Sequence, residues 1–477
     1  MKFKLEQFLF YFLFFAIPLQ TRKILYSPGW YYNEWQSVSL YFTDLILLAL
    51  FIFWGFNHIL ATQNTNHKTQ ITNKSQNTNH KKFLNFFHLR QGFGGQVISQ
   101  FLKPDFYLVL FLAAAAVSIK NSSDFYVGAF LWLKLVEFAL FYFYLKIYAI
   151  RRFGFVGVLY TLIIGGVFQA VIAIGQFLKQ GDLGLRWLGE SVLGSQMVGI
   201  ASFYTSVGDK VIRAYGTTPH SNVLAAYLFL AIVAFYFVVF YTKPNKFLVH
   251  SGHFIMLIGL FASFSRTIIF LFFANFFGRG FLVNFVKRFR EKYLFGNFFK
   301  KKIVPIFLVT VIATVAFMSF YWPEIQSRMT LSSEEEAVQL RVFYNKESLG
   351  GGINLFGIGL GDFTGWLMEQ NPNLPSYMYQ PVHNIYLLIY SEVGILGLIF
   401  FLLFLAGLFY EFIKKTQLRE LKHYSFLLVA VSVLFIGLFD HFLLTIQQGR
   451  FIFWLSLALL GALAPSLNKY FPENDPE

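Results

Sequence analysis

The feature that most constrains this chain is a series of long apolar segments separated by polar stretches. About twelve of them are long enough, at roughly 17 to 25 residues with some shorter, to cross the ~30 Å hydrocarbon layer of a bilayer. With 56% hydrophobic and 13% charged residues, the chain has more apolar surface than a soluble core could bury. The sequence therefore predicts an all-α polytopic membrane protein, 1–477 forming one domain, with spans at 5–20, 38–56, 104–119, 128–148, 153–177, 221–241, 247–264, 267–284, 303–321, 385–409, 424–441 and 451–466.

The distribution of lysine and arginine predicts the orientation of these spans. The two segments richest in basic residues, 57–103 and 279–302, lie on the same side of the predicted spans. Because short basic loops stay in the cytoplasm, both termini are expected to be cytoplasmic, and the large loop at 321–384, between the ninth and tenth spans, external. The net charge of +15 is then explained by anionic lipid headgroups, and nucleic acid is not an expected partner.

A polar insertion and a pair of opposite charges within a span are both interpreted as structural features. Residues 57–103 contain Gln63–Lys68 repeated as Gln76–Lys81 and no acidic residue, a composition that predicts a disordered cytoplasmic insertion. In the fourth span, Lys134 and Glu137 lie three residues apart on one helical face. They are expected to neutralise each other as a structural pair.

Conspicuous polar residues gather at the predicted outer face, among them Arg213, Arg266, Arg341 and Arg450. An arginine at a membrane boundary is commonly an anchor that reaches the lipid headgroups. Arginine is disfavoured on the outer side, however, and these arginines stand beside Gly, Ser, Thr and His. This setting indicates an anionic ligand, because the planar guanidinium group fits phosphate oxygens.

The loop at 321–384 carries the residue on which the functional prediction centres. His383 ends this loop, and an imidazole with an ordinary pKa near 6.5 can be neutral there and accept a proton. The glycine-rich run from Gly357 to Phe363 lacks the preceding strand and the Lys-Ser/Thr ending of a phosphate-binding loop. The run is therefore predicted to form tight turns that shape the loop.

Several of these segments together resemble the O-antigen ligase and O-antigen polymerase superfamily. The resemblance covers roughly residues 160–460 and rests on the order and spacing of the segments, because no single motif is specific. Ser221-Asn222 in place of the usual Pro-Asn, and the insertion at 57–103, depart from the pattern. The segments that carry it are Gln169 to Phe177, Arg213-Ala-Tyr-Gly-Thr with Asn222, Phe264-Ser-Arg-Thr267, Arg341 to Phe363, and His383-Asn384 followed by Glu392-Val-Gly394 and Gly397.

The resemblance implies a glycosyltransferase of the cytoplasmic (inner) membrane that needs neither metal nor nucleotide. Such a protein moves a glycan from an undecaprenyl-diphosphate carrier to a hydroxyl of an acceptor glycan, lipid or protein at the outer face. The resemblance implies that Arg213 and Arg266 hold the diphosphate and that His383 acts on the acceptor hydroxyl. Guanidinium groups would stabilise charge on the leaving diphosphate, and a base on the opposite side would give inversion. Acceptor binding or loop support is expected of Arg341, Asn384, Glu392 and Arg450.

Two other functions stay open from the sequence. A lipid-linked glycan flippase, or another polytopic transporter, would show internal repeats and polar or broken helices near the middle of the membrane, whereas polarity here is concentrated outside. A zinc hydrolase could use His220, His383 and His441, although their spacing is not a known ligand pattern.

The predicted orientation can be tested by labelling single cysteines, because the chain has none of its own. In intact cells, an impermeant thiol reagent should label Ser333→Cys in the outer loop and leave Ser75→Cys in the insertion unlabelled. The opposite labelling pattern would overturn the orientation and, with it, the location of the site.

Overall fold

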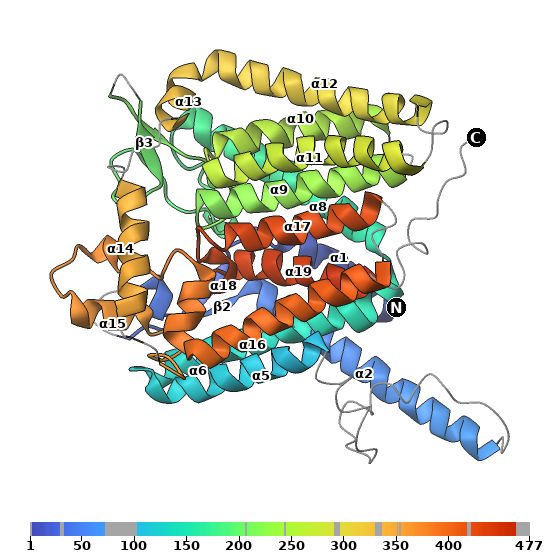
Figure 1. The fold of residues 1–477 in the computed structure, drawn as a ribbon, viewed down its shortest axis with the longest axis vertical. Coiled ribbons are helices and arrows are strands. Elements are labelled where there is room, and N and C mark those ends of the chain that lie inside the picture. Colours follow the sequence, from blue (N-terminus) through green and yellow to red (C-terminus); the bar gives the residue numbers. More distant parts are fainter. Residues whose placement is uncertain are drawn as a thin grey trace.

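The computed structural model consists mainly of helices, as the sequence predicts (Figure 1). It describes residues 2–28, 33–71, 103–205, 208–242, 245–290, 296–329, 336–350, 352, 354–416 and 421–463. The part of the insertion at 72–102 lies outside the described residues, whereas residues 57–71 continue a helix that begins at Phe42.

Each predicted apolar segment coincides with a helix. Six helices among the described residues are long and apolar enough to cross a membrane. They cover 104–121, 125–153, 155–179, 221–241, 302–320 and 385–416. The class of multi-pass helical membrane protein is confirmed, and the full set of twelve spans stays a prediction. The main helices are α1 (Lys2–Ala16), α2 (Phe42–Ile71), α5 (Pro104–Ser118), α6 (Phe125–Phe143), α8 (Phe155–Lys179), α9 (Ser221–Tyr241), α10 (Lys246–Ala262), α11 (Arg266–Arg290), α12 (Gly296–Phe320), α16 (Ile385–Thr416), α17 (Leu421–Ile436) and α19 (Gln447–Leu463).

Helix α9 forms the centre of the bundle. It is apolar on all sides, and 94% of its most apolar stretch is buried, as expected for a helix without a polar face. Helices α8, α10, α11, α17 and α19 pack around it, while α5 packs along α16 at one side of the bundle (Figure 1). The first turn of α9, which carries Asn222, is therefore held by the core.

Two small antiparallel hairpins depart from the all-α prediction. Strand β1 (Arg22–Tyr26) pairs with β2 (Val38–Tyr41), and β3 (Ser202–Tyr204) pairs with β4 (Lys210–Ile212). These segments connect helices, so their backbone N–H and C=O groups need partners outside a helix, which strand pairing supplies. Their β-branched and aromatic residues favour extended backbone.

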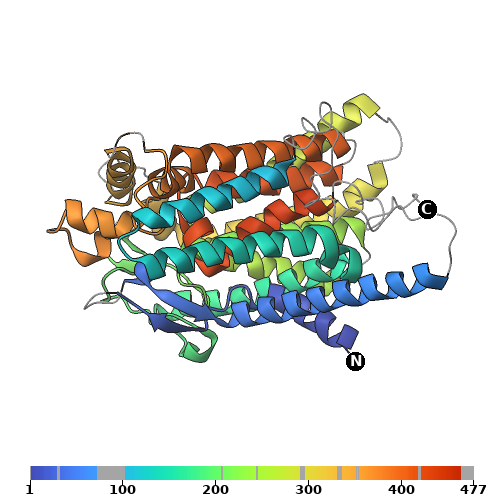
Figure 2. The same ribbon diagram turned by 90° about the horizontal axis from the view of Figure 1, so that it is seen from below.

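The predicted outer loop at 321–384 is also largely helical. It contains α13 (Trp322–Met329), α14 (Glu336–Gly350) and α15 (Phe363–Gln370). Figures 1 and 2 show α14, α15 and both hairpins at the same end of the bundle, opposite the first residues of α1. Short α-helices within the described residues also include α7 (Ile150–Phe153), which continues α6 through a π-helical turn (Tyr144–Ala149), and α18 (Phe442–Thr445).

Helix α16 is interrupted at Gly394, within a segment that the sequence predicts to be an unbroken span over 385–409. Gly394 has φ 85° and ψ −179°, and the N–H of Ile395 donates to the Asn354 carbonyl at 3.0 Å. The backbone of 354–359 runs against the interruption, since the N–H of Ile358 donates to the Ser391 carbonyl at 2.8 Å. A segment from the preceding loop thus replaces helical hydrogen bonds that the break removes.

The glycine-rich run forms the tight turns that the sequence predicts. Gly357, Gly359 and Gly361 have φ values of 70°, 121° and 78°, which place all three in the region that favours glycine. A Cβ atom at Gly357 would lie 2.3 Å from the Glu392 carbonyl oxygen. The run therefore lets the loop approach the broken helix closely.

The predicted Lys134–Glu137 pair is confirmed, with 2.9 Å between Nζ and Oε2. The structure adds a third member, because Lys134 Nζ also lies 2.5 Å from Oδ2 of Asp44 on α2. Gln447 on α19 donates a hydrogen bond to the other oxygen of Asp44. One buried cation thus joins three helices, and each charge has a partner inside the bundle.

The break in α16 generates a prediction about stability. Gly394→Ala should lower the melting temperature of the purified protein by several degrees, because left-handed backbone costs a non-glycine residue about 1 to 3 kcal/mol. The new Cβ would also lie 2.3 Å from the Leu355 carbonyl oxygen. Gly55→Ala, in α2 with nothing within 4 Å of the added Cβ, is the matched control and should not destabilise. Equal melting temperatures for the two variants would contradict this account of the break.

Candidate functional site

A buried guanidinium group lies at the end of the bundle where the hairpins gather. Arg213 follows β4 directly, and only 9% of the residue is exposed. Its Nε donates to the Ser263 carbonyl at 2.7 Å, and its Nη2 donates to Oδ1 of Asn222 at 2.6 Å. These bonds use two of the five guanidinium N–H donors and fix the plane of the group, so the remaining donors can meet an anion.

Two buried glutamines of α8 hold the loop that follows Arg213. Oε1 of Gln176 accepts from the N–H groups of Tyr215 and Gly216, and Oε1 of Gln169 accepts from that of Thr217. The glutamine-spaced end of the fifth predicted span therefore satisfies buried backbone donors of this loop. These bonds fix the backbone that positions Arg213.

Asn222 connects this loop to two distant segments. Its Oδ1 also accepts from the hydroxyl of Ser265 at 2.9 Å, and its Nδ2 donates to Oδ2 of Asp440 at 2.8 Å. Ser265 lies in the tight turn predicted between α10 and α11, and Arg266 begins α11 immediately after it. Arg266 is partly buried and follows the turn that binds both Arg213 and Asn222.

His383 and His441 lie in contact beside Asp440. Their ring centroids are 4.8 Å apart in an edge-to-face arrangement, and the ring of Tyr344 on α14 stacks on His383 at 5.3 Å. Nδ1 of His441 lies 2.7 Å from the hydroxyl of Thr445. Nδ1 of His383 is buried and has no hydrogen-bond partner within the described part of the chain. The hydrogen-bonding capacity of this ring nitrogen is therefore unused within that part of the chain.

Burial keeps these histidines neutral. It lowers the pKa of His220, which caps α9, to about 4, and that of His441 to about 3. Burial also lowers the pKa of His383. The charge of Asp440 raises this pKa, and the charge of Arg341 lowers it. At neutral pH each imidazole therefore has a lone pair that can accept a proton.

Asp440 is the carboxylate of this cluster. Burial alone would raise its pKa, yet the three surrounding histidines and the hydrogen bond from Asn222 bring the pKa below its usual value. Asp440 is therefore ionised at neutral pH, and the basic and polar groups around it are His220, Asn222, His383 and His441.

Positive charge exceeds negative charge around Arg213. Burial, together with the nearby guanidinium groups of Arg328 and Arg341, lowers its pKa to about 9, while Tyr215 and Asp440 act in the opposite direction. Arg341 lies on α14, and its Nε donates to the Phe439 carbonyl at 3.2 Å. An anion would offset this excess of positive charge, in keeping with the anionic ligand that the sequence indicates for this face.

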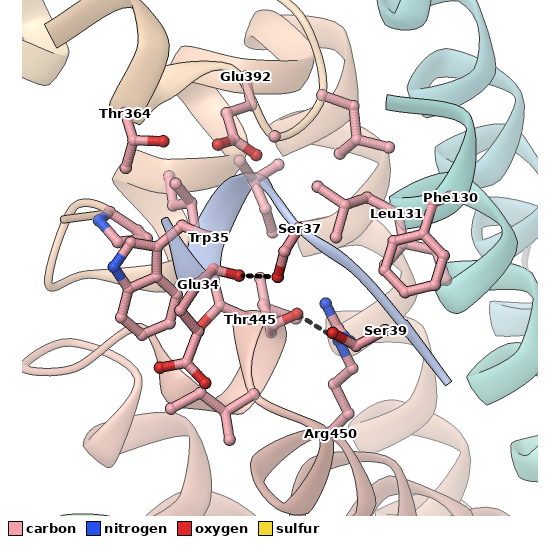
Figure 3. Close-up of a pocket in the computed structure, with 18 of the residues that line it drawn as sticks. Glu34, Trp35, Ser37, Ser39, Phe130, Leu131, Thr364, Glu392, Thr445 and Arg450 are labelled. Carbon is pink, nitrogen blue, oxygen red and sulfur yellow. Dashed lines mark hydrogen bonds between the residues drawn. The ribbon is translucent and has the colours of Figure 1, made fainter. Parts of the chain in front are cut away.

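The other predicted site residues occupy different places. Asn384 caps α16, because its Oδ1 accepts from the N–H groups of Tyr386 and Leu387. Arg450 does not lie in an outer turn, as the sequence predicts, but in the first turn of α19, which begins four residues earlier than the expected span. Arg450 and Glu392 line a pocket that Arg213 does not line (Figure 3).

Sequence reasoning missed Asp440, Tyr344, Arg328 and Trp35 as members of the site. Asp440 offered one signal, since it stands directly before a histidine in an outer turn. Trp35 offered none, because it reaches the site only through the unforeseen β1–β2 hairpin, where its ring contacts that of His441 at 4.8 Å. Among the described residues, no group of three or more His, Asp or Glu side chains is arranged to hold a metal ion.

Comparison with known proteins identifies one family. Residues 251–402 match the model of the family described as O-antigen ligase. The match includes Arg266, Arg341 and His383 and covers a shorter range than the predicted 160–460, so Arg213 lies outside it. A search of curated proteins finds no match. The family match confirms the resemblance that the sequence motifs indicate, and it points to glycosyl transfer at a membrane.

Proposed function

We propose that the chain, whose residues 251–402 match the O-antigen ligase family, transfers or polymerises a glycan from an undecaprenyl-diphosphate carrier. The acceptor is a hydroxyl group of a glycan, lipid or protein. The reaction takes place at the outer face of the cytoplasmic membrane, proceeds with inversion and uses no metal ion or nucleotide.

One observation carries this proposal: Asn222 joins the anion-binding arginine to the cluster that contains the base. It accepts from Arg213 at 2.6 Å and donates to Asp440 at 2.8 Å, and Asp440 lies among His383, His441 and His220. An arginine for a diphosphate and a neutral histidine for a hydroxyl thus lie in one cluster, in which hydrogen bonds join Arg213, Asn222 and Asp440 and the ring of His383 contacts that of His441. Transfer between two bound substrates needs this kind of fixed orientation.

In the proposed reaction, the acceptor oxygen forms a bond to the anomeric carbon of the donor sugar. The bond from that carbon to the diphosphate oxygen breaks, and the carrier diphosphate leaves with the electron pair. His383 takes the proton of the acceptor hydroxyl. Arg213 and Arg266 offset the negative charge that develops on the leaving oxygens, where fixed donors lower the barrier most.

Arg213→Ala and Arg266→Ala should each weaken donor binding and slow transfer sharply. Lysine should restore only part of the activity, because it lacks the planar fork and cannot make both bonds that Arg213 makes to Ser263 and Asn222. The measurements are donor affinity and turnover with purified protein, with melting temperature as a check on folding. Arg186→Ala, an exposed arginine outside the cluster, is the control. Unchanged donor affinity and turnover in both alanine variants would show that these arginines serve only as anchors.

His383→Ala should reduce transfer by about 10²- to 10⁴-fold, which is the usual contribution of a general base, and leave donor binding near the parent value. Transfer by the parent should fall as the pH drops through the pKa of His383, since the protonated ring cannot accept a proton. Because burial lowers that pKa, the fall should lie below pH 6.5. His80→Ala, in the predicted insertion, should transfer at the parent rate. Parent-like transfer by His383→Ala, or loss of donor binding instead of transfer, would contradict this role.

A further inference from the structure

The pocket that adjoins His441 is lined by two groups of segments. The β1–β2 hairpin and the short helix before β2 supply Glu34, Trp35 and Ser39, while α15, α16 and α19 supply Thr364, Glu392 and Arg450 (Figure 3). Figure 3 shows Thr364 and Glu392 on the opposite side of the pocket from Arg450. The pocket therefore lies between segments that are far apart in the sequence.

This pocket adjoins the proposed base. Trp35, which lines it, contacts the ring of His441, and Thr445, which also lines it, lies 2.7 Å from Nδ1 of His441. The His441 ring in turn contacts that of His383 at 4.8 Å. Pro381 lines the pocket two residues before His383.

The pocket is lined by polar and charged groups. Arg22 and Glu34, both of which line it, form an ion pair at 2.8 Å. Arg450 donates to the Leu444 carbonyl at 2.6 Å, and Glu392 contributes a buried carboxyl group. An acyl chain would leave these groups without water or polar partners, so a polar ligand fits best.

Two buried hydroxyl groups in the pocket favour a ligand that forms hydrogen bonds. Ser39 is 3% exposed and Thr364 is 2% exposed, and neither hydroxyl oxygen has a hydrogen-bond partner within the described residues. Both residues line the pocket. A buried hydroxyl without a partner destabilises the folded protein, so a ligand that donates or accepts hydrogen bonds there would recover this free energy. Trp35 adds an apolar aromatic surface beside them.

We propose that this pocket binds a sugar ring of the acceptor, whose hydroxyl then reaches His383. A sugar is neutral, carries many hydroxyl groups for the arginines, carboxylates, Ser39 and Thr364, and has an apolar face of C–H groups for Trp35. The assignment to the acceptor rests on the proposed transferase function, because Arg213 and Arg266, to which the donor diphosphate is assigned, do not line this pocket.

Saturation-transfer NMR on the protein in lipid nanodiscs tests the proposal. The probes are the methyl glycosides of glucose, galactose, mannose and N-acetylglucosamine. At least one should give a signal with the parent protein. Trp35→Ala should remove most of it, and the isosteric Thr364→Val should weaken binding about five-fold, as expected for one lost hydrogen bond. Trp187→Ala, at a tryptophan that is 73% exposed and does not line the pocket, is the matched control and should keep the signal.

The outcomes separate this proposal from the proposed function. The sugar pocket would be overturned if no glycoside gave a signal with the parent protein, or if Trp35→Ala and Trp187→Ala gave equal signals. Either result is expected if the pocket binds an acyl chain instead of a sugar. Such a result together with transfer that depends on Arg213 and His383 would leave the transferase function intact. The converse result is sugar binding that depends on Trp35 together with transfer at the parent rate by His383→Ala. That result would support the sugar pocket and refute the catalytic role of His383.

Discussion

The hydrogen bonds of Asn222 are the interaction on which the rest of the site depends. One carboxamide accepts from Arg213 and Ser265 and donates to Asp440, so it joins the loop before α9, the turn before α11 and the turn after α17. Its position is firm because α9 is buried in the centre of the bundle. Removal of this side chain would leave a buried cation and a buried carboxylate without their shared partner, and both are costly to bury alone.

The surroundings of Arg213 and the pocket differ in charge. Arg213 interacts with Arg328 and Arg341, and Asp440 opposes them. The pocket, which adjoins His441 through Trp35 and Thr445, contains the Arg22–Glu34 ion pair, Arg450 and the buried carboxyl group of Glu392. Under the proposed function, the charged donor binds near the arginines, and the neutral imidazole of His383 accepts the proton of the acceptor.

The sequence predicts what depends on local composition. Apolar length predicts the helices, the glycines at 357, 359 and 361 predict tight turns, and the unusual outer arginines point to Arg213 as part of a site. It does not predict contacts that depend on folding. Asn222 and Asp440 are 218 residues apart, and nothing in either neighbourhood specifies their hydrogen bond. The sequence likewise does not predict the β1–β2 hairpin, because short paired strands gain their stability from the surfaces they pack against.

The break at Gly394 shows why α16 and the preceding loop act as one unit. Irregular backbone within an apolar helix is tolerated where other protein groups satisfy it, and here the segment 354–359 does so by hydrogen-bonding across the break. The same contacts hold Glu392, whose Oε1 accepts weakly from the N–H of Phe363 at 3.4 Å, at the edge of the pocket. An unbroken helix would continue its own hydrogen bonds and release the loop. The glycine run, the broken helix and the pocket wall therefore depend on one another, and the position of the proposed acceptor subsite is set by the same backbone contacts that end the first half of α16.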